Sequence, residues 1–192
     1  MEPRPEVFIQ ERELIQRILS GDTDAYAGIV RDYQSKVTGL CLSFLRDATQ
    51  AEDASQEIFL KAYQALRSFQ GNSSFSTWLY RIASNHCKDL LRQRSRQKTE
   101  SFEALVESGA QLPEPSSDPA AVLEAADMVE KLLSTLSAEE RLILTLREAQ
   151  GLSYQEIAGT LGCSLDAVKS RLKRARQTLE EKLRHFSTAG NV

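Results

Sequence analysis

Apolar residues recur at every third or fourth position along most of this chain, which is the spacing of amphipathic helices. The first such pattern stops at Gly21, and either Asp22 or Thr23 can cap the helix that follows. The spacing predicts helices over about residues 14–19, 23–45, 51–69, 76–94, 122–136, 137–149, 153–161 and 164–186. Because no strand pattern of useful length interrupts them, we expect an all-α fold.

The helical pattern fails between about residues 93 and 119. Charged residues, serines and three of the five prolines fill this segment instead. We interpret residues 96–119 as a flexible acidic linker that joins two small helical domains, residues 1–95 and 120–192. Each domain has enough residues for a compact hydrophobic core.

Composition places the chain among globular proteins, with 41% hydrophobic and 27% charged residues. No run approaches the roughly 18 consecutive apolar residues that a membrane-spanning helix needs. The first residues also lack the apolar segment of a signal peptide. We therefore expect a cytoplasmic protein without membrane insertion.

The net charge of −3 hides a strong segregation of charge along the chain. Residues 76–98 carry 6 basic groups and 1 acidic group, and residues 164–184 carry 7 basic and 3 acidic groups. Residues 99–130 carry 8 acidic groups and no basic group. Two basic islands in an acidic chain are typical of a nucleic-acid-binding protein.

The cysteines and histidines do not suggest metal binding. Cys41, Cys87 and Cys163 are widely spaced, and no spacing typical of zinc ligands occurs. We expect no metal, no cofactor and reduced thiols. His86 and Cys87 are neighbours that point in different directions on a helix, which predicts a buried thiol beside an exposed imidazole.

Residues 152–179 (LSYQEIAGTLGCSLDAVKSRLKRARQTL) have the pattern of a helix-turn-helix. Ser153 and Glu156 form a capping box at the start of the first helix, and Gly162 suits the tight turn that ends it. The second helix turns an apolar stripe inward and leaves outside it Lys169, Ser170, Arg171, Lys173 and Arg174. Arginine and lysine bind guanine edges and phosphates, so we predict duplex DNA binding in preference to a merely solvated basic face.

Residues 68–96 interleave aromatic and basic side chains. Aromatic rings stack on unpaired bases and cations follow the phosphates, which together suit single-stranded or melted DNA. The candidates from this pattern are Phe69, Phe75, Trp78, Arg81 and Lys88. Trp78 also shares the helical spacing of core residues with Leu79 and Ile82, so a structural role for Trp78 is equally consistent with the pattern.

Residues 51–66 form an amphipathic pattern whose polar side is acidic and rich in amides. The residues on this side are Glu52, Asp53, Gln56, Glu57 and Lys61. Such a face suits docking on a basic helical surface of a partner protein. The alternative is an ordinary solvated helix face.

Together these motifs resemble bacterial sigma factors of the extracytoplasmic-function group, also called group 4 of the sigma-70 family. AEDASQEIFLKAYQAL resembles region 2.2, FSTWLYRIASNHCKDLLR resembles regions 2.3 and 2.4, and LREAQGLSYQEIAGTLGCSLDAVKSRLKRAR resembles region 4.2. The resemblance runs from about Leu14 to Leu183. It implies sigma-2-like and sigma-4-like domains in a stress- or envelope-responsive transcription initiation factor, which is not an enzyme.

The resemblance also implies partners and residue roles. The expected partners are core RNA polymerase (β′ clamp helices and β flap), promoter DNA as duplex and melted strand, and an anti-sigma factor that can hold the protein at the inner membrane. Polymerase docking is implied for Asp53, Gln56, Glu57 and Lys61. Minus-10 recognition is implied for the loop 68–76 and for Phe69, Ile82, Ala83 and Asn85. Minus-35 recognition is implied for the five outward residues of the second helix named above.

Three other classes of protein share some of these features. A DNA-binding regulator with a sensing domain would bind duplex DNA without polymerase. A nuclease or deaminase would need a metal cluster or a general base in a cleft, which the sequence does not supply. A protein-interaction module would carry its basic helices only incidentally.

Overall fold

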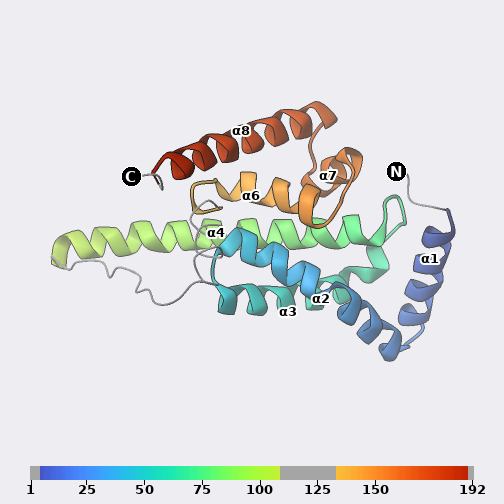
Figure 1. Ribbon diagram of the computed structural model, residues 1–192. Helices are drawn as coiled ribbons and strands as arrows, with labels where there is room; N and C mark the ends of the chain where they lie inside the picture. Colours follow the sequence, from blue (N-terminus) through green and yellow to red (C-terminus); the bar gives the residue numbers. More distant parts are fainter. Residues whose placement is uncertain (1–4, 109–132, 190–192) are drawn as a thin grey trace, which may run out of the picture.

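The computed structural model describes the backbone of residues 5–108 and 133–189, and the side chains of residues 12–96 and 133–184. In the first range the elements are α1 (Pro5–Leu19), α2 (Thr23–Leu45), α3 (Ala48–Ala65), the short 3-10 turn η1 (Leu66–Ser68) and α4 (Phe75–Ser108). In the second range they are α6 (Ala138–Leu144), the π-helical turn η2 (Thr145–Ala149), α7 (Tyr154–Leu161) and α8 (Leu165–Ala189). Every regular element in these ranges is helical, which confirms the all-α prediction (Figure 1).

Short polar side chains set where α2 and α3 begin. Asp22 caps α2, because its Oδ1 accepts a hydrogen bond from the Ala25 N–H at 3.0 Å, which decides between the two predicted caps. Arg46 ends α2 in the left-handed conformation at φ 56°. Asp47 then caps α3 by accepting from the Gln50 N–H at 2.9 Å. The predicted turn is therefore shorter than expected, and α3 begins before residue 51.

Helices α2, α3 and α4 pack against one another in the first range, and α1 crosses one end of them (Figure 1). The largest fully buried side chains here include Leu40, Phe44, Ile58 and Leu79. They come from the predicted apolar stripes of the three helices. Burial of such stripes supplies most of the stability of helices in proteins.

Helix α4 continues to Ser108, well past the predicted end near residue 94. The added segment, residues 95–108 (SRQKTESFEALVES), contains no proline or glycine and is rich in good helix formers, so a helical backbone persists after the apolar stripe has ended. The rest of the predicted linker (109–119) and most of the predicted helix 122–136 lie outside the described residues. Of that helix, residues 133 and 134 are helical and Leu136 lies in the turn before α6.

The second range forms the predicted helix-turn-helix. Ser137 and Ser153 each begin a helix with a capping box, in which the hydroxyl accepts from the N–H of Glu140 or Glu156 and that glutamate accepts from the serine N–H. Gly162 ends α7 in the left-handed conformation at φ 62°. Ser164 then accepts from the Ala167 N–H at 3.2 Å and starts α8.

The two described ranges pack into one body with a continuous core. Helix α4 contacts α7 and α2 contacts α6, as the stacked layers of Figure 1 show. The buried Arg141 of α6 donates from Nε to the Ser43 carbonyl at 2.6 Å and from the same guanidinium to the Phe44 carbonyl at 3.5 Å. Tyr80 Oη donates to Gln150 Oε1 at 3.0 Å. The sequence did not predict how the two units sit together.

Candidate nucleic-acid and partner interfaces

The predicted duplex-binding residues lie on the outward face of α8. Val168, Leu172 and Ala175 of α8 are fully or almost fully buried against α6 and α7. This packing leaves Lys169, Ser170, Lys173 and Arg174 exposed and Arg171 half-buried. All five predicted residues therefore lie outside the core on the second helix of the helix-turn-helix, which is the element that enters a major groove in such motifs.

Acidic groups border this basic face on two sides. Arg176 pairs with Glu148 of η2 at 2.7 Å, and Arg174 lies near Glu140 at the start of α6. Hydrogen bonds from the Ser137 backbone and side chain, together with the nearby charge of Arg174, lower the pKa of Glu140. Glu140 therefore stays ionised and partly offsets Arg174. Lys169 also pairs with Asp166 in the first turn of α8, with Nζ 3.3 Å from Oδ1, while Lys173 is exposed.

An aromatic cluster joins the loop after η1 to the first turn of α4. The ring centroids of Phe69 and Trp78 are 5.4 Å apart, and both rings lie within 6 Å of the Phe75 ring. Phe75 is only 2% exposed and also packs on Tyr33 of α2. The ring of Phe75 is therefore part of the core in this arrangement, and the expected contact of Phe75 with DNA stays a prediction. Phe69 and Trp78 are half-buried and keep one side accessible.

A polar stripe follows Trp78 along α4. Arg81 and Asn85 are exposed, and Lys88 is half-buried, at the spacing that aligns residues on one helix face. Ile82 borders this stripe and is also half-buried. Ala83 faces the opposite way and is completely buried in this arrangement, and the implied contact of Ala83 with a base stays a prediction. The stripe unites a half-exposed indole, an amide and two cations.

The loop before α4 ends in a helix cap and lies against α1. Ser74 caps the helix by accepting from the Thr77 N–H at 3.2 Å. Gly71 has φ 70°, and a Cβ atom at this position would lie 2.9 Å from Nε of Arg12. The α1 residue Arg12 therefore lies directly against the loop. Sequence reasoning missed Arg12, because its helix showed only an ordinary mixture of charges.

The predicted docking face lies along α3. Asp53, Gln56, Glu57 and Lys61 are all exposed there. Leu60 lies among them with 63% of its surface exposed, which is unusual for a large apolar side chain on a helix that packs on two others. Sequence reasoning missed Leu60, although an apolar residue within an otherwise polar helix face was the available signal.

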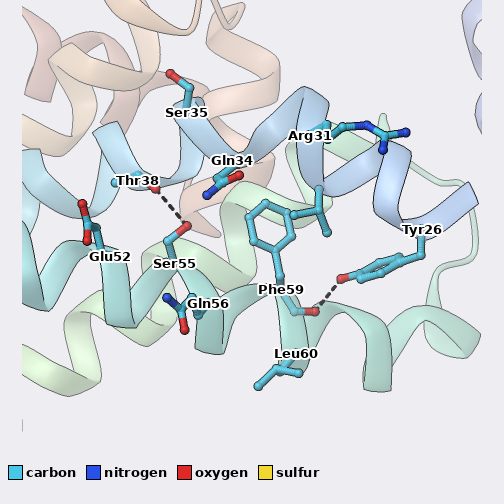
Figure 2. A pocket seen from close by; sticks show the side chains of 11 residues that line it. Tyr26, Arg31, Gln34, Ser35, Thr38, Glu52, Ser55, Gln56, Phe59 and Leu60 are labelled. Carbon is cyan, nitrogen blue, oxygen red and sulfur yellow. Dashed lines mark hydrogen bonds between the residues drawn. The ribbon is translucent and has the colours of Figure 1, made fainter. Parts of the chain in front are cut away.

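A groove runs beside this face between α2 and α3 (Figure 2). Its floor includes Phe59, whose backbone carbonyl accepts a hydrogen bond from Tyr26 Oη at 2.5 Å. Thr38 and Ser55 hydrogen-bond across it at 3.0 Å. Gln56 and Leu60 therefore stand next to a hollow with both apolar and polar walls, a shape that suits a side chain of a helical partner.

Neither a metal centre nor a membrane span is found in the part of the chain that the structure describes. No three histidine, cysteine, aspartate or glutamate side chains there are grouped so as to hold a metal ion. None of the helices described is long and apolar enough to cross a bilayer.

The family model for Sigma-70 region 2 matches residues 29–97, and the model for Sigma-70 region 4 matches residues 126–179. The chain is 39% identical over 181 residues to the RNA polymerase sigma-H factor of Pseudomonas aeruginosa, covering 91% of this chain and 94% of that protein. The chain belongs to the extracytoplasmic-function group of sigma-70 factors. This sigma factor is also 37% identical over 182 residues to the ECF RNA polymerase sigma-E factor of Escherichia coli, covering 91% and 95% of the two chains.

Solved structures resemble this sigma factor over both of its units. One is CnrH in complex with the cytosolic domain of CnrY, with a TM-score of 0.68, 28% identity and coverage of 91% and 97%. Another is the sigma factor RpoE in complex with the anti-sigma factor NepR from Bartonella quintana, with a TM-score of 0.67, 28% identity and coverage of 83% and 96%. As a sigma factor, the chain is a transcription initiation factor rather than an enzyme.

Proposed function

We propose that this sigma factor uses three separate faces to bring core RNA polymerase to specific promoters and start transcription. The observation that carries the proposal is the separation of three chemistries on one chain. Helix α3 exposes acidic and amide groups around Leu60, α4 exposes an indole with an amide and cations, and α8 exposes a basic recognition face. Each chemistry suits a different partner surface.

The α3 face docks on core polymerase, at the β′ clamp helices. Asp53, Gln56 and Glu57 offer acceptors to a basic partner, and Leu60 offers an apolar anchor beside the groove. An exposed apolar group ringed by polar ones is the usual composition of a docking surface. The domain that carries α8 would contact the β flap.

The loop before α4 and the α4 stripe recognise and open the minus-10 element. Asn85 can offer both a donor and an acceptor to an extruded base. Phe69 and Trp78 supply half-exposed rings for stacking, and Arg81 and Lys88 supply cations for the backbone. Stacking offsets part of the few kcal/mol that unpairing a base costs.

Helix α8 reads the minus-35 element in the major groove. Lys169, Lys173 and Arg174 face outward where base edges and phosphates would lie. Binding through such contacts falls steeply with added salt, because each neutralised phosphate releases counterions.

An anti-sigma factor controls the protein by covering these faces. The support is the likeness to CnrH and to the Bartonella quintana sigma factor, each solved with a protein partner. We place the protein in the cytoplasm, where polymerase and promoters are, and an anti-sigma factor anchored in the inner membrane would hold it there until an envelope or other stress releases it.

The test is transcription by the purified chain with core polymerase on a library of promoter sequences. Promoter-specific transcripts that require the chain would support the proposal. Tight duplex binding without any effect on polymerase would instead indicate an ordinary DNA-binding regulator.

Point variants test which face of the protein binds which partner. Asn85→Ala should reduce discrimination among minus-10 sequences and leave the affinity for core polymerase unchanged. Arg171→Ala combined with Arg174→Ala should weaken minus-35 binding by about 1–3 kcal/mol per base-contacting residue. Lys182→Ala removes an exposed charge further along α8 and serves as the control, with a small and sequence-independent effect. Loss of polymerase binding in Asn85→Ala would mean that α4 is assigned wrongly.

A further inference from the structure

One imidazole is buried between α3 and α4, contrary to the expectation of an exposed ring. His86 of α4 is only 5% exposed, because α4 has neighbours on several sides and this side of it is covered by α3. Its ring lies behind two residues of the α3 face. Lys61 Nζ is 2.6 Å from Nδ1, and Glu57 Oε2 is 3.4 Å from Nε2.

The side chains beside His86 define the protonation state of its ring and the nitrogen that carries the proton. An ammonium group only donates hydrogen bonds, so Nδ1 accepts from Lys61 and the single ring proton is on Nε2. Nε2 is buried and makes no hydrogen bond of normal geometry, and Glu57 Oε2 is the carboxylate oxygen beside it. Burial and the charge of Lys61 lower the pKa of His86 below its ordinary 6.5, although Glu57 and Asp89 act in the opposite direction. The ring is therefore neutral at pH 7.

This arrangement holds the Lys61 ammonium group against the ring and places the Glu57 carboxylate beside it. Lys61 and Glu57 are exposed and four residues apart on α3, which is the spacing at which such residues pair directly with each other. The buried ring instead engages the lysine and lies beside the glutamate. Side chains that are already ordered lose less entropy when a partner binds them.

We propose that His86 is a positioning residue for polymerase docking: its neutral ring orients Lys61 from behind, next to Glu57, and protonation of the ring weakens binding to core polymerase. The inference rests on the proposed docking role of the α3 face. It assigns to an α4 residue an effect on polymerase binding, whereas its exposed neighbour Asn85 serves promoter DNA.

The direction of the pH effect follows from the charges around the ring. Glu57 and Lys61 face it from α3, and Asp89 acts on it from α4. A protonated ring cannot accept from Lys61 and repels it, while Glu57 is drawn toward the ring. The affinity for core polymerase is therefore highest when the ring is neutral. It declines as the pH falls below 6.5, the ordinary pKa of histidine.

The experiment measures the dissociation constant of the labelled full chain for core polymerase between pH 7.5 and 5.5. His86→Leu removes the acceptor and should weaken binding by roughly fivefold at pH 7.5. His86→Asn places an amide oxygen near the position of Nδ1 and should restore binding to within about twofold of the native chain. Because asparagine does not titrate, the native chain should lose affinity relative to His86→Asn as the pH falls. This ratio cancels titration of the polymerase itself.

Two further variants distinguish failure of the positioning role of His86 from failure of the proposed docking role of the α3 face. If Glu57→Ala and Lys61→Ala do not weaken polymerase binding, α3 is not the docking face and both ideas fail. If they weaken binding but His86→Leu does not, the positioning role alone is overturned. Identical pH profiles for the native chain and His86→Asn would overturn it as well. If His86→Leu does not fold, as judged by circular dichroism, the comparison with His86→Asn decides the matter.

Discussion

The three cysteines differ sharply in how their thiols are placed. Cys41 and Cys87 meet between α2 and α4 with their sulfurs 3.6 Å apart, and neither has any exposed surface. The hydrogen bond from Cys87, together with burial, raises the pKa of the Cys41 thiol. A protonated and buried thiol is a poor nucleophile. Cys163 follows Gly162 and is partly exposed.

We therefore expect iodoacetamide to modify Cys163 in the native chain, and to modify Cys41 and Cys87 only after unfolding. Mass spectrometry of the intact protein, with and without urea, measures the number and order of the additions. A Cys163→Ser variant serves as the control and should take up no label until it unfolds. Equal rates at all three thiols in the native chain would contradict the burial of the α2–α4 pair.

Sequence reasoning placed individual residues well where a helix has a single buried side. The period of α8 correctly put Val168 and Leu172 inside and Lys173 outside. It failed on α4, where His86 is buried although its position on the helix predicted an exposed imidazole. Helix α4 packs on α2, α3 and α7, so it has several buried sides, and periodicity alone cannot say which residues remain accessible.

At the scale of elements, the turn of the helix-turn-helix depends on one glycine. Gly162 has φ 62°, and nothing lies within 4 Å of the Cβ that a substitution would add. Gly162→Ala should therefore destabilise the fold by about 1 kcal/mol through backbone strain alone. Gly39 is the matched control, because it is helical and equally open. Gly39→Ala should stabilise the fold by roughly 0.5–1 kcal/mol. Urea unfolding measures both changes, and a shift of the same sign in the two variants would refute the role of the turn.

Helix beginnings were more predictable than helix ends. Ser153 was identified as a cap from the glutamate three residues later, and it forms the predicted capping box. Ser137 and Glu140 have the same spacing and form a second capping box. A cap is a local interaction between neighbours in sequence, so a short motif is sufficient to find it. The end of α4 was missed, because the loss of the apolar stripe after residue 94 marks the loss of packing and not the loss of helical backbone.

At the scale of the whole molecule, the packing of the two units was not predictable. Arg141 is 8% exposed, although an arginine is normally assigned to the surface. Its guanidinium binds carbonyls at the end of α2 and, in its own unit, those of Leu133 and Leu136. Nothing near Arg141 in the sequence indicates these acceptors, since the Ser43 and Phe44 carbonyls lie almost a hundred residues away.

The packing of the two units against each other limits which promoter elements the closed molecule can reach. Elements named for positions 10 and 35 lie 25 base pairs apart, which corresponds to roughly 85 Å along B-form DNA. Helix α4 contacts α7 directly, and α7 is joined to α8 through a three-residue turn. If α4 and α8 bind these elements as proposed, a chain closed in this way holds the two faces too near each other to reach both elements at once. We therefore expect the units to separate on the polymerase.

A disulfide between the units tests this requirement. A Cβ added at Gly159 of α7 would lie 3.5 Å from Cγ2 of Thr77 of α4, which is close enough for cysteines at both positions to join after a small adjustment. In a Cys163→Ser background, the Thr77→Cys, Gly159→Cys chain should cross-link when oxidised by diamide, as seen by its mobility on a non-reducing gel. The oxidised chain should direct at least roughly tenfold less promoter-specific transcription, because a locked pair cannot span both elements. Dithiothreitol should restore the activity, and each single-cysteine variant should be insensitive to oxidation. Full activity of the cross-linked chain would show that both elements are reached without separation of the units.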